Sequence, residues 1–427
     1  MKDENNLYWV WLAERVGIAS KSFSRIVEKY DDPYDVYRLE SEEIEQLEGI
    51  SPRLKEKLCD KSLEKAYSIL QYCKKNRIDI IGYRNKRYPM SLRSLEDPPV
   101  VLYCKGHLPD INSCLCVGMV GTRKMSEYGK QSAYKISYEL GAANVCVVSG
   151  MALGIDGVCA CGTIESGGQT VAVLGCGISV TYPREHEKLM QAIIKHGAVV
   201  SEYPPFERPN PGNFPKRNRI ISGMCQGVII VEGARGSGAL ITASKAIAQG
   251  REVFALPGKI NDSNSEGPNQ LIKDGVNVVL RADDIIEHYD FLYHDTISFR
   301  GLSRAKRSAV PCEEALEKYG VASVYHKERY IPSKDSPISV ETEDMGKTEA
   351  VSQQTSVPAV SDNSESIFLG LDEGTQKIFA LIPDGTAFTP DAVAAHGIDV
   401  GEVITALTVL EICGLVASLP GGLYIKK

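Results

Sequence analysis

The sequence predicts an α/β protein whose largest part is a doubly wound, mostly parallel sheet. Between residues 80 and 290, short apolar runs alternate with longer stretches of helical periodicity, such as SEYGKQSAYKISYELG. This alternation is typical of βαβ units. The runs are apolar throughout rather than at every second residue, as expected for strands that helices cover on both faces.

The apolar runs that we interpret as strands follow one another at the spacing of such units. Most of them are separated by a helical pattern, for example REHEKLMQAIIKHG. The predicted strands are Cys114–Val120, Val145–Ser149, Thr170–Leu174, Ala198–Ser201, Gly227–Glu232, Glu252–Ala255 and Asn277–Leu280.

Residues 1–79 predict a small bundle of short amphipathic helices. In the segment EEIEQLEGISPRLKEKL, Gly49 stands at the end of one helix and Pro52 in the first turn of the next. Glycine just past a helix and proline just inside its start are the usual boundary residues. We therefore expect a tight turn followed by a short helix at this point.

The C-terminal part of the chain predicts a second small domain. In residues 367–427 three short helical patterns precede ASLPGGLYIKK, which is typical of a hairpin, and Thr389 caps the second helix before Pro390. This order predicts a winged helix. Residues 291–330 are weakly patterned, and residues 331–366 are rich in Ser, Thr, Pro and Glu without any aromatic residue. We interpret 291–366 as a variable segment that ends in a disordered linker.

The composition excludes several classes of protein. The 427 residues are 43% hydrophobic and 24% charged, which is ordinary for soluble globular domains. There is no apolar run long enough to span a membrane and no signal-peptide pattern, so we expect a cytoplasmic protein. The 12 cysteines lack zinc-site spacing and predict reduced packing residues, without a metal or a disulfide framework.

Taken as a whole, the formal net charge of −7 argues against a nucleic-acid partner. The charge is unevenly distributed, however, because residues 331–427 carry −9 while residues 80–290 carry +2. Any anion site is therefore expected in the sheet domain. We hypothesise that the acidic flanks discourage binding to duplex DNA.

Four glycine-rich loops follow predicted strands, at the end of the sheet where doubly wound folds bind ligands. Glycine allows the backbone to approach a ligand closely, although each loop is also compatible with an ordinary surface turn. The loops are Gly121–Ser126, Ser149–Asp156, Gly175–Gly177 and Gly233–Gly238.

Individual residues of these loops have alternative interpretations. Arg123 suits a phosphate contact or a solvent-exposed turn, and Ser126 is a candidate N-cap for a helix whose first amides favour an anion. Asp156 is expected to cap the next helix. Cys176 is a weak candidate nucleophile, because no partner histidine is identifiable.

The nucleotide fingerprints G-x-G-x-x-G and G-x4-G-K-[ST] are absent from the sequence. The second predicted strand also ends in Ser149, where a ribose-binding carboxylate would be expected. A dinucleotide site and a P-loop ATPase are therefore disfavoured, and we expect no cofactor.

The segment Asn213–Ile221 concentrates three cations beside an aromatic residue, at the predicted start of a helix. Phe214, Lys216, Arg217 and Arg219 provide these side chains. Cations at a helix N-terminus oppose the helix dipole, so helix stability does not explain them. An aromatic ring beside cations is typical of single-strand binding. The alternative is that one of Arg217 and Arg219 pairs internally with Glu202 or Glu232.

These motifs together resemble the DNA-processing protein A family, DprA or Smf. The resemblance covers about residues 80–290. It rests on GTRKMSEYG, SGMALGIDGVCACGT, AVLGCGISVTYPREH, SEYPP, FPKRNRIISGMCQGVIIVEG and GSGALITASKAIAQGREVFALPG, in that order. The N-terminal helices resemble a SAM or helix-hairpin-helix domain of the family, and the C-terminal part resembles its winged-helix domain. The resemblance implies an extended Rossmann-like sheet.

The resemblance also implies a function without enzymatic activity. Members bind single-stranded DNA, form homodimers and load the recombinase RecA onto incoming DNA during natural transformation. The single-strand contacts of the family correspond here to Arg123, Phe214, Lys216, Arg217 and Arg219, with Ser149, Gly150, Ser237 and Gly238 lining the same pocket. The first loop carries Thr122 where the family usually has serine, a change that keeps the hydroxyl.

Two other functions remain open from the sequence. The sheet also resembles that of nucleotide-cleaving phosphoribohydrolases, but GARGSGALIT stands where their PGGxGTxxE motif is expected, without a following catalytic glutamate. A purely architectural role would use the winged helix on duplex DNA. The net charge of −4 of residues 367–427 argues against strong phosphate binding there.

Overall fold

The structure is a computed structural model. It describes residues 2–307, 312–321, 373–383, 386–412, 415–419 and 423–426. The predicted linker, residues 331–366, lies outside the described residues. Within the described parts of the chain, no helix is both long and apolar enough to cross a membrane.

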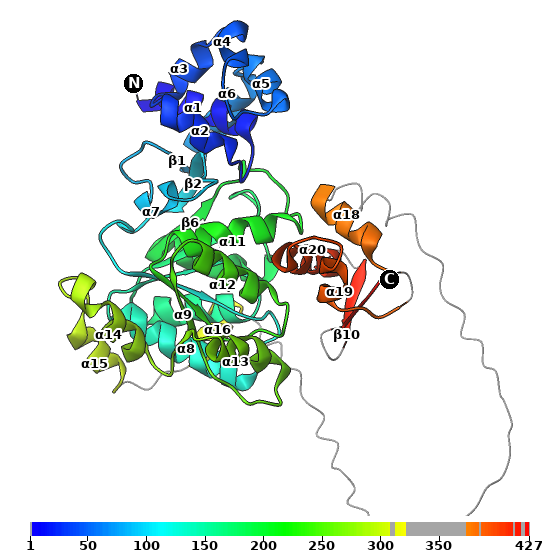
Figure 1. Ribbon diagram of the computed structural model, residues 1–427. Coiled ribbons are helices and arrows are strands. Elements are labelled where there is room, and N and C mark those ends of the chain that lie inside the picture. The colour runs from blue at the N-terminus through cyan, green and yellow to red at the C-terminus, as the bar shows by residue number, and fades with distance from the viewer. Residues whose placement is uncertain are drawn as a thin grey trace, which may run out of the picture.

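The N-terminal bundle lies at one end of the molecule (Figure 1). As predicted, Pro52 lies in the first turn of a helix and Gly49, with φ +70°, stands just before it; Ser51 caps this helix by accepting a hydrogen bond from the N–H of Leu54. The ring of Trp9 lies against Gly82 of the sheet, where an added Cβ would come within 2.7 Å of it. The bundle and the sheet therefore share one continuous core. Its helices are α1 (Lys2–Val16), α2 (Ser22–Lys29), α3 (Pro33–Arg38), α4 (Ser41–Glu45), α5 (Pro52–Cys59) and α6 (Glu64–Lys75).

The central sheet has nine strands in the order β1-β2-β6-β5-β4-β3-β7-β8-β9. All the predicted strands are present, with ends that differ by a few residues. The prediction missed β1 and β2, which form an antiparallel edge because β2 pairs antiparallel with both β1 and β6. The strands are β1 (Asp79–Gly82), β2 (Val101–Gly106), β3 (Cys116–Val120), β4 (Cys146–Ser149), β5 (Thr170–Leu174), β6 (Gly197–Ser201), β7 (Gly227–Ile230), β8 (Glu252–Ala255) and β9 (Asn277–Val278).

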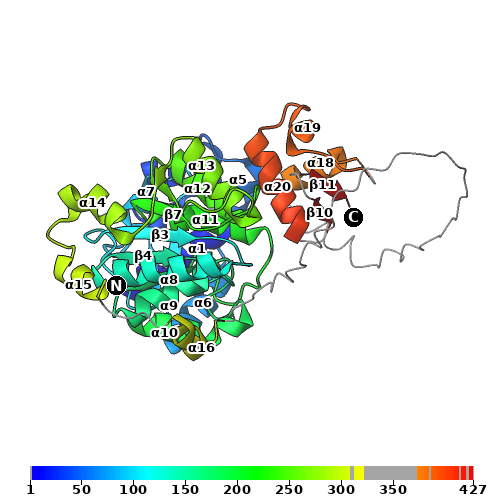
Figure 2. The ribbon, with the colours of Figure 1, turned by 90° about the horizontal axis from the view of Figure 1, so that it is seen from below.

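Helices cover both faces of the sheet, as the apolar strands require. Figure 2 shows α8 (Glu127–Ala142), α9 (Ile155–Glu165) and α10 (Glu187–His196) on one side of the strands. On the other side lie α11 (Asn213–Gly223), α12 (Gly238–Ala248) and α13 (Glu266–Lys273). The remaining short helices of this region are α7 (Met90–Arg93), η1 (Arg184–His186) and η2 (Ser263–Ser265).

Residues 282–307 and 312–321 also pack on the sheet domain. It forms α14 (Ala282–Tyr293), α15 (Phe299–Ala305) and α16 (Cys312–Tyr319). Leu302, Leu316 and Val321 are buried in the same core as the strands. These contacts extend the sheet domain beyond the predicted boundary at residue 290.

The described residues of the C-terminal part contain three helices and two antiparallel strands around a separate core, as expected for a winged helix. Thr389 caps the second helix by accepting the N–H of Ala392. The Thr408 hydroxyl donates a hydrogen bond of 3.2 Å to the Gly236 carbonyl of the sheet domain. The elements are α18 (Glu373–Leu381), α19 (Pro390–Ala394), α20 (Val400–Ile412), β10 (Val416–Leu419) and β11 (Leu423–Lys426).

Candidate nucleic-acid interface

The glycine-rich loops meet at the carboxyl edge of the parallel strands. The chain runs outward from β3 through β4 and β5 to β6, then returns to place β7 on the other side of β3. The point where the strand order reverses therefore lies between β3 and β7, where such sheets open a crevice. The Gly121–Ser126 loop and the Gly233–Gly238 loop flank this point.

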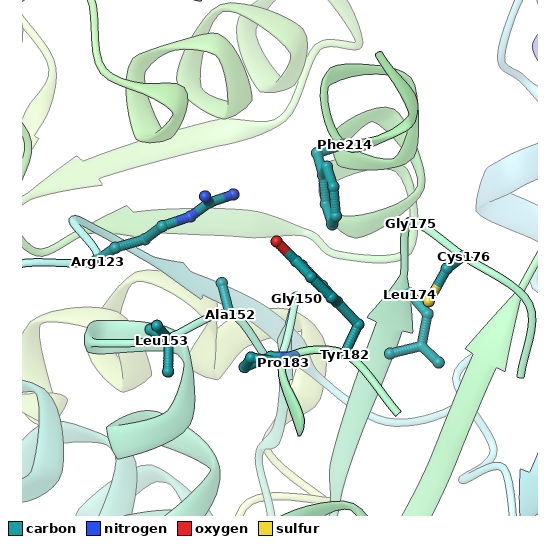
Figure 3. A pocket seen from close by; sticks show the side chains of 10 residues that line it. All are labelled: Arg123, Gly150, Ala152, Leu153, Leu174, Gly175, Cys176, Tyr182, Pro183 and Phe214. Carbon is teal, nitrogen blue, oxygen red and sulfur yellow. The ribbon is translucent and has the colours of Figure 1, made fainter. Parts of the chain in front are cut away.

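A pocket of about 40 Å³ lies above the ends of β3, β4 and β5 (Figure 3). It brings together three residues that the sequence predicted from separate motifs, Arg123, Gly150 and Phe214. Figure 3 shows the side chains of Arg123 and Tyr182 extending toward the space beside Phe214. The remaining lining residues are Ala152, Leu153, Leu174, Gly175, Cys176 and Pro183.

The Phe214 ring is fixed by contacts on several sides. It lies on Gly175, where an added Cβ would come within 2.8 Å of the ring. The Tyr182 ring lies 5.3 Å from it, centroid to centroid, at 38°. The guanidinium carbon of Arg123 lies 5.7 Å from the Phe214 centroid. An exposed cation and two partly exposed aromatic rings therefore share one surface.

Tyr182 was missed as a candidate site residue. Its position in the sequence held a usable signal, because an aromatic residue follows a few positions after the glycine-rich loop Gly175–Gly177. The ring is 37% exposed and faces the pocket.

Arg217 lies beneath the pocket rather than in it. It is buried, and its guanidinium donates to the Gly150 carbonyl at 2.8 Å and to the Val173 carbonyl. Its Nε donates to the Asn218 side chain, and its guanidinium carbon lies 5.8 Å from the Phe214 centroid. Burial lowers the pKa of Arg217, although the nearby Asp156 charge opposes this. The hydrogen-bond acceptors of this cation are all neutral.

Asp156 fixes the loop after β4. Its carboxylate accepts the backbone N–H groups of Gly150 at 3.1 Å and Ala152 at 3.4 Å. Because helix α9 begins at Ile155, Asp156 lies in the first turn and ties the preceding loop to the helix, so the expectation of a simple N-cap was wrong. Burial raises the pKa of Asp156, and the Arg217 charge opposes that rise.

Arg219 lies inside the protein, and its predicted DNA contact is corrected. The side chain is 2% exposed and donates to both carboxylate oxygens of Glu202, at 2.8 and 2.7 Å. Asp97 lies 3.2 Å from its Nε. The expectation that one of the two arginines pairs internally with Glu202 or Glu232 is confirmed for Arg219, which we remove from the proposed contacts.

Ser149 is also turned inward. Its hydroxyl is buried and donates to the Met119 carbonyl at 2.8 Å, so only the neighbouring Gly150 reaches the pocket. We remove the Ser149 side chain from the proposed contacts as well. The Ser149 hydroxyl, at the end of β4, instead completes the hydrogen bonding of the adjacent strand β3.

The N-terminus of α8 already holds an internal anion. Ser126 caps the helix as predicted, by accepting the N–H of Gly129 at 3.0 Å. The buried Glu232 carboxylate accepts the backbone N–H of Ser126 at 2.9 Å and also its hydroxyl. An added Cβ at Gly129 would come within 2.2 Å of that carboxyl group. Burial raises the pKa of Glu232, and the Ser126 hydrogen bonds oppose the rise. A ligand phosphate is therefore not expected at these amides.

The remaining predicted contacts lie outside the pocket. Lys216 is exposed on α11, and Ser237 and Gly238 begin α12. The Asn218 amide donates to the Gly238 carbonyl at 3.4 Å, which joins the starts of α11 and α12. Ser237 and Gly238 therefore lie near α11, the helix that carries Phe214, but they do not line the pocket.

The pocket offers no evident catalytic group. Cys176 is buried, its thiol faces the Val180 carbonyl at 3.5 Å, and burial raises its pKa to about 11, so it is protonated at neutral pH. None of the residues described as lining the pocket is acidic. The described residues contain no group of three or more His, Cys, Asp or Glu suited to a metal ion, and every cysteine among them is free.

Comparisons with known proteins identify the family to which the sheet domain is similar. Residues 79–290 match the family model for DNA recombination-mediator protein A. The chain is 41% identical over 219 residues to DNA processing protein DprA of Bacillus subtilis, covering 51% of this chain and 74% of that protein. It is 27% identical over 431 residues to protein Smf of Synechocystis, covering 100% of both. The X-ray structure of DNA processing protein A from Streptococcus pneumoniae matches with a TM-score of 0.58 and 31% identity, covering 66% of this chain and 97% of that chain.

Proposed function

Because the chain belongs to the DprA (Smf) family of DNA recombination mediators, we propose that the pocket at Arg123 and Phe214 binds single-stranded DNA. The observation that carries the proposal is that two cations lie within 6 Å of the centre of the Phe214 ring, the exposed Arg123 at 5.7 Å and the buried Arg217 at 5.8 Å. Stacking on an aromatic ring beside cations is how proteins bind single strands without reading their sequence.

The pocket suits a base and its phosphate rather than an apolar ligand. Phe214 and Tyr182 provide ring faces for a base, and Arg123 provides a flexible donor for a phosphate. Arg217 adds a positive charge that no hydrogen-bonded carboxylate neutralises within the described structure. Because these hydrogen bonds hold the Arg217 side chain rigidly, it needs little reorganisation when an anion binds.

Contacts outside the pocket complete the proposed site. Lys216 is exposed on the same helix as Phe214 and would meet a phosphate of the adjoining strand. Ser237 and Gly238 would meet the strand where α12 begins, close to Asn218. These contacts recognise the charge and shape of the DNA backbone but not the identity of the bases. Binding is therefore expected to tolerate every DNA sequence.

We further propose that the protein acts without catalysis or a cofactor, as a cytoplasmic homodimer that loads the recombinase RecA onto the bound strand during natural transformation. Support comes from membership of a recombination-mediator family. The nucleotide-cleaving alternative is tested by chromatography of AMP incubated with the protein. Release of adenine would favour that enzyme over the binding role.

The sharpest test of the pocket is Phe214→Ala. Loss of the ring is expected to weaken binding to oligothymidylate by about 1–3 kcal/mol, the contribution of one stacked base. Fluorescence anisotropy titrations measure this difference. Phe206→Ala is the matched control, because Phe206 is 56% exposed and packs on Tyr72 outside the pocket, with ring centroids 4.2 Å apart. Unchanged binding by Phe214→Ala would show that the pocket is assigned wrongly.

A further inference from the structure

A second, larger hollow lies on the other side of the Gly121–Ser126 loop. It is an open groove of about 1400 Å³ between that loop, the first turn of α8 and the chain from Pro257 to Asn264 after β8. It shares its wall with the pocket, because Arg123 lines the pocket and the next residue, Lys124, lines the groove. Consecutive Cα atoms are about 3.8 Å apart, so the two hollows lie against the same loop, one on each side of it.

The walls of the groove are cross-linked. The Asn264 amide donates to the Lys124 carbonyl at 2.9 Å, and the Tyr128 hydroxyl donates to the Pro257 carbonyl at 2.8 Å. The second bond holds the Tyr128 ring in place while 48% of the side chain stays exposed. An aromatic ring fixed in this way loses little entropy when another ring stacks on it.

The charges of the groove also favour an anionic chain. Lys124 and Lys259 are exposed, and neither has an ion pair within the described part of the protein. Two carboxylates line the groove as well. Glu127 pairs with the buried Lys130 at 3.0 Å, and Asp262 accepts the Asn264 N–H at 3.0 Å. The acidic groups therefore have internal partners, while the two lysines remain available to a ligand.

The geometry points to this groove as the site that binds the continuation of the single strand beyond the pocket. One base stacks on Tyr128, and Lys124 and Lys259 meet the phosphates on either side of it. This inference rests on the proposed function, since it names a longer path for the same strand. It adds Lys124, Tyr128 and Lys259 to the binding surface, none of which the sequence motifs singled out.

The test compares a short oligothymidylate of about six nucleotides with a longer one of about twenty, since single-strand sites of this kind span roughly 4–16 nucleotides. Tyr128→Ala is expected to weaken binding of the longer strand by roughly 5- to 150-fold, as expected for loss of one stacked base, and to leave the short strand unaffected. The double variant Lys124→Ala/Lys259→Ala is expected to reduce the salt dependence for the longer strand by about 1.4 in slope. Lys273→Ala is the control, because Lys273 is an exposed lysine at the end of α13, outside the groove.

The outcomes separate this inference from the proposed function. If Arg123→Ala weakens both oligonucleotides while Tyr128→Ala and the double lysine variant weaken neither, the groove is not part of the path and the pocket still stands. If Tyr128→Ala weakens both lengths equally, the residue acts on the pocket and the separate groove is overturned. If Arg123→Ala weakens neither length, the proposed function itself fails. Because Lys124 and Lys259 are exposed, the double variant keeps the test informative should Tyr128→Ala fold poorly.

Discussion

Arg217 and Arg219 are two residues apart on α11, yet they occupy opposite environments. Both are buried, but Arg219 is neutralised by Glu202 and Asp97, whereas Arg217 donates to backbone carbonyls and an amide. A guanidinium that is paired with carboxylates contributes no net charge to its surroundings. Arg217 is held by neutral oxygens instead, and the nearby Asp156 carboxylate acts on it through its charge without a hydrogen bond. Its guanidinium carbon lies 5.8 Å from the Phe214 centroid. The comparison shows that the acceptors of a buried cation, rather than its burial, decide how far its charge is neutralised within the fold.

The largest expected effect is the loss of folding stability when Arg219 is replaced. Arg219→Met leaves Glu202 buried without its partner, so the free energy of unfolding is expected to fall by about 3–5 kcal/mol. Urea unfolding measures this, with Arg235→Met at an exposed loop position as the control. Binding to oligothymidylate at a temperature where the variant is folded should stay at the wild-type level. A variant that keeps its stability but loses DNA binding would reverse the comparison.

Arg217→Met should affect both properties. The Gly150 and Val173 carbonyls lose a charged donor, which is expected to lower the free energy of unfolding by roughly 1.5–3 kcal/mol. Oligothymidylate affinity should fall as well, because the positive charge beneath Phe214 is removed. Arg217→Lys keeps the charge but loses the hydrogen-bonding geometry of the guanidinium. Compared with Arg217→Met, it should recover part of the DNA affinity and a smaller part of the free energy of unfolding. Equal behaviour of the Arg217 and Arg219 variants in the binding assay would contradict the distinction drawn between them.

Arg123 provides an exposed cation with which to calibrate this comparison. Arg123→Gln should reduce the slope of log K against log[salt] by about 0.7, the value for one phosphate of a single strand. It should leave the free energy of unfolding unchanged, because the side chain is exposed. Titrations at several salt concentrations measure the slope. A slope equal to that of the wild type would mean that Arg123 meets no phosphate.

The smallest effect concerns the loop that Arg217 supports. His186 is fully buried and its Nδ1 donates to the Met151 carbonyl at 3.1 Å, while Nε2 has no hydrogen-bond partner within the described structure. Burial lowers the pKa of His186, so its contribution to stability is present above the unfolded pKa of about 6.5 and is lost as the pH falls through the lower folded value. The free energy of unfolding should therefore fall on acidification, by at most about 1.4 kcal/mol per pH unit for this group. Urea unfolding at neutral and mildly acidic pH tests this, and His186→Asn should remove that part of the pH dependence.

The sequence determined the sheet and placed the glycine-rich loops of the candidate site at its carboxyl edge. Strands buried on both faces must be apolar throughout, so β3 to β8 were visible as runs, and the glycine-rich loops followed from their ends. The antiparallel strands β1 and β2 were not predicted, because nothing in the local pattern shows which distant strand they pair with. Tyr182, Tyr128 and Lys259 were missed for the same reason, since each joins a surface only through neighbours that are remote in the chain.

The tertiary structure alone decided which polar groups face a ligand and which face inward. The sequence offered Arg217 and Arg219 as equivalent and left open that one pairs with Glu202 or Glu232. It could not reveal that Glu202 lies beside Arg219, or that Glu232 occupies the N-terminus of α8. Local spacing fixes the face of a helix on which a residue lies. The partner of a buried charge depends instead on elements brought together by folding, and that partner determines whether the charge stabilises the fold or remains available to a ligand.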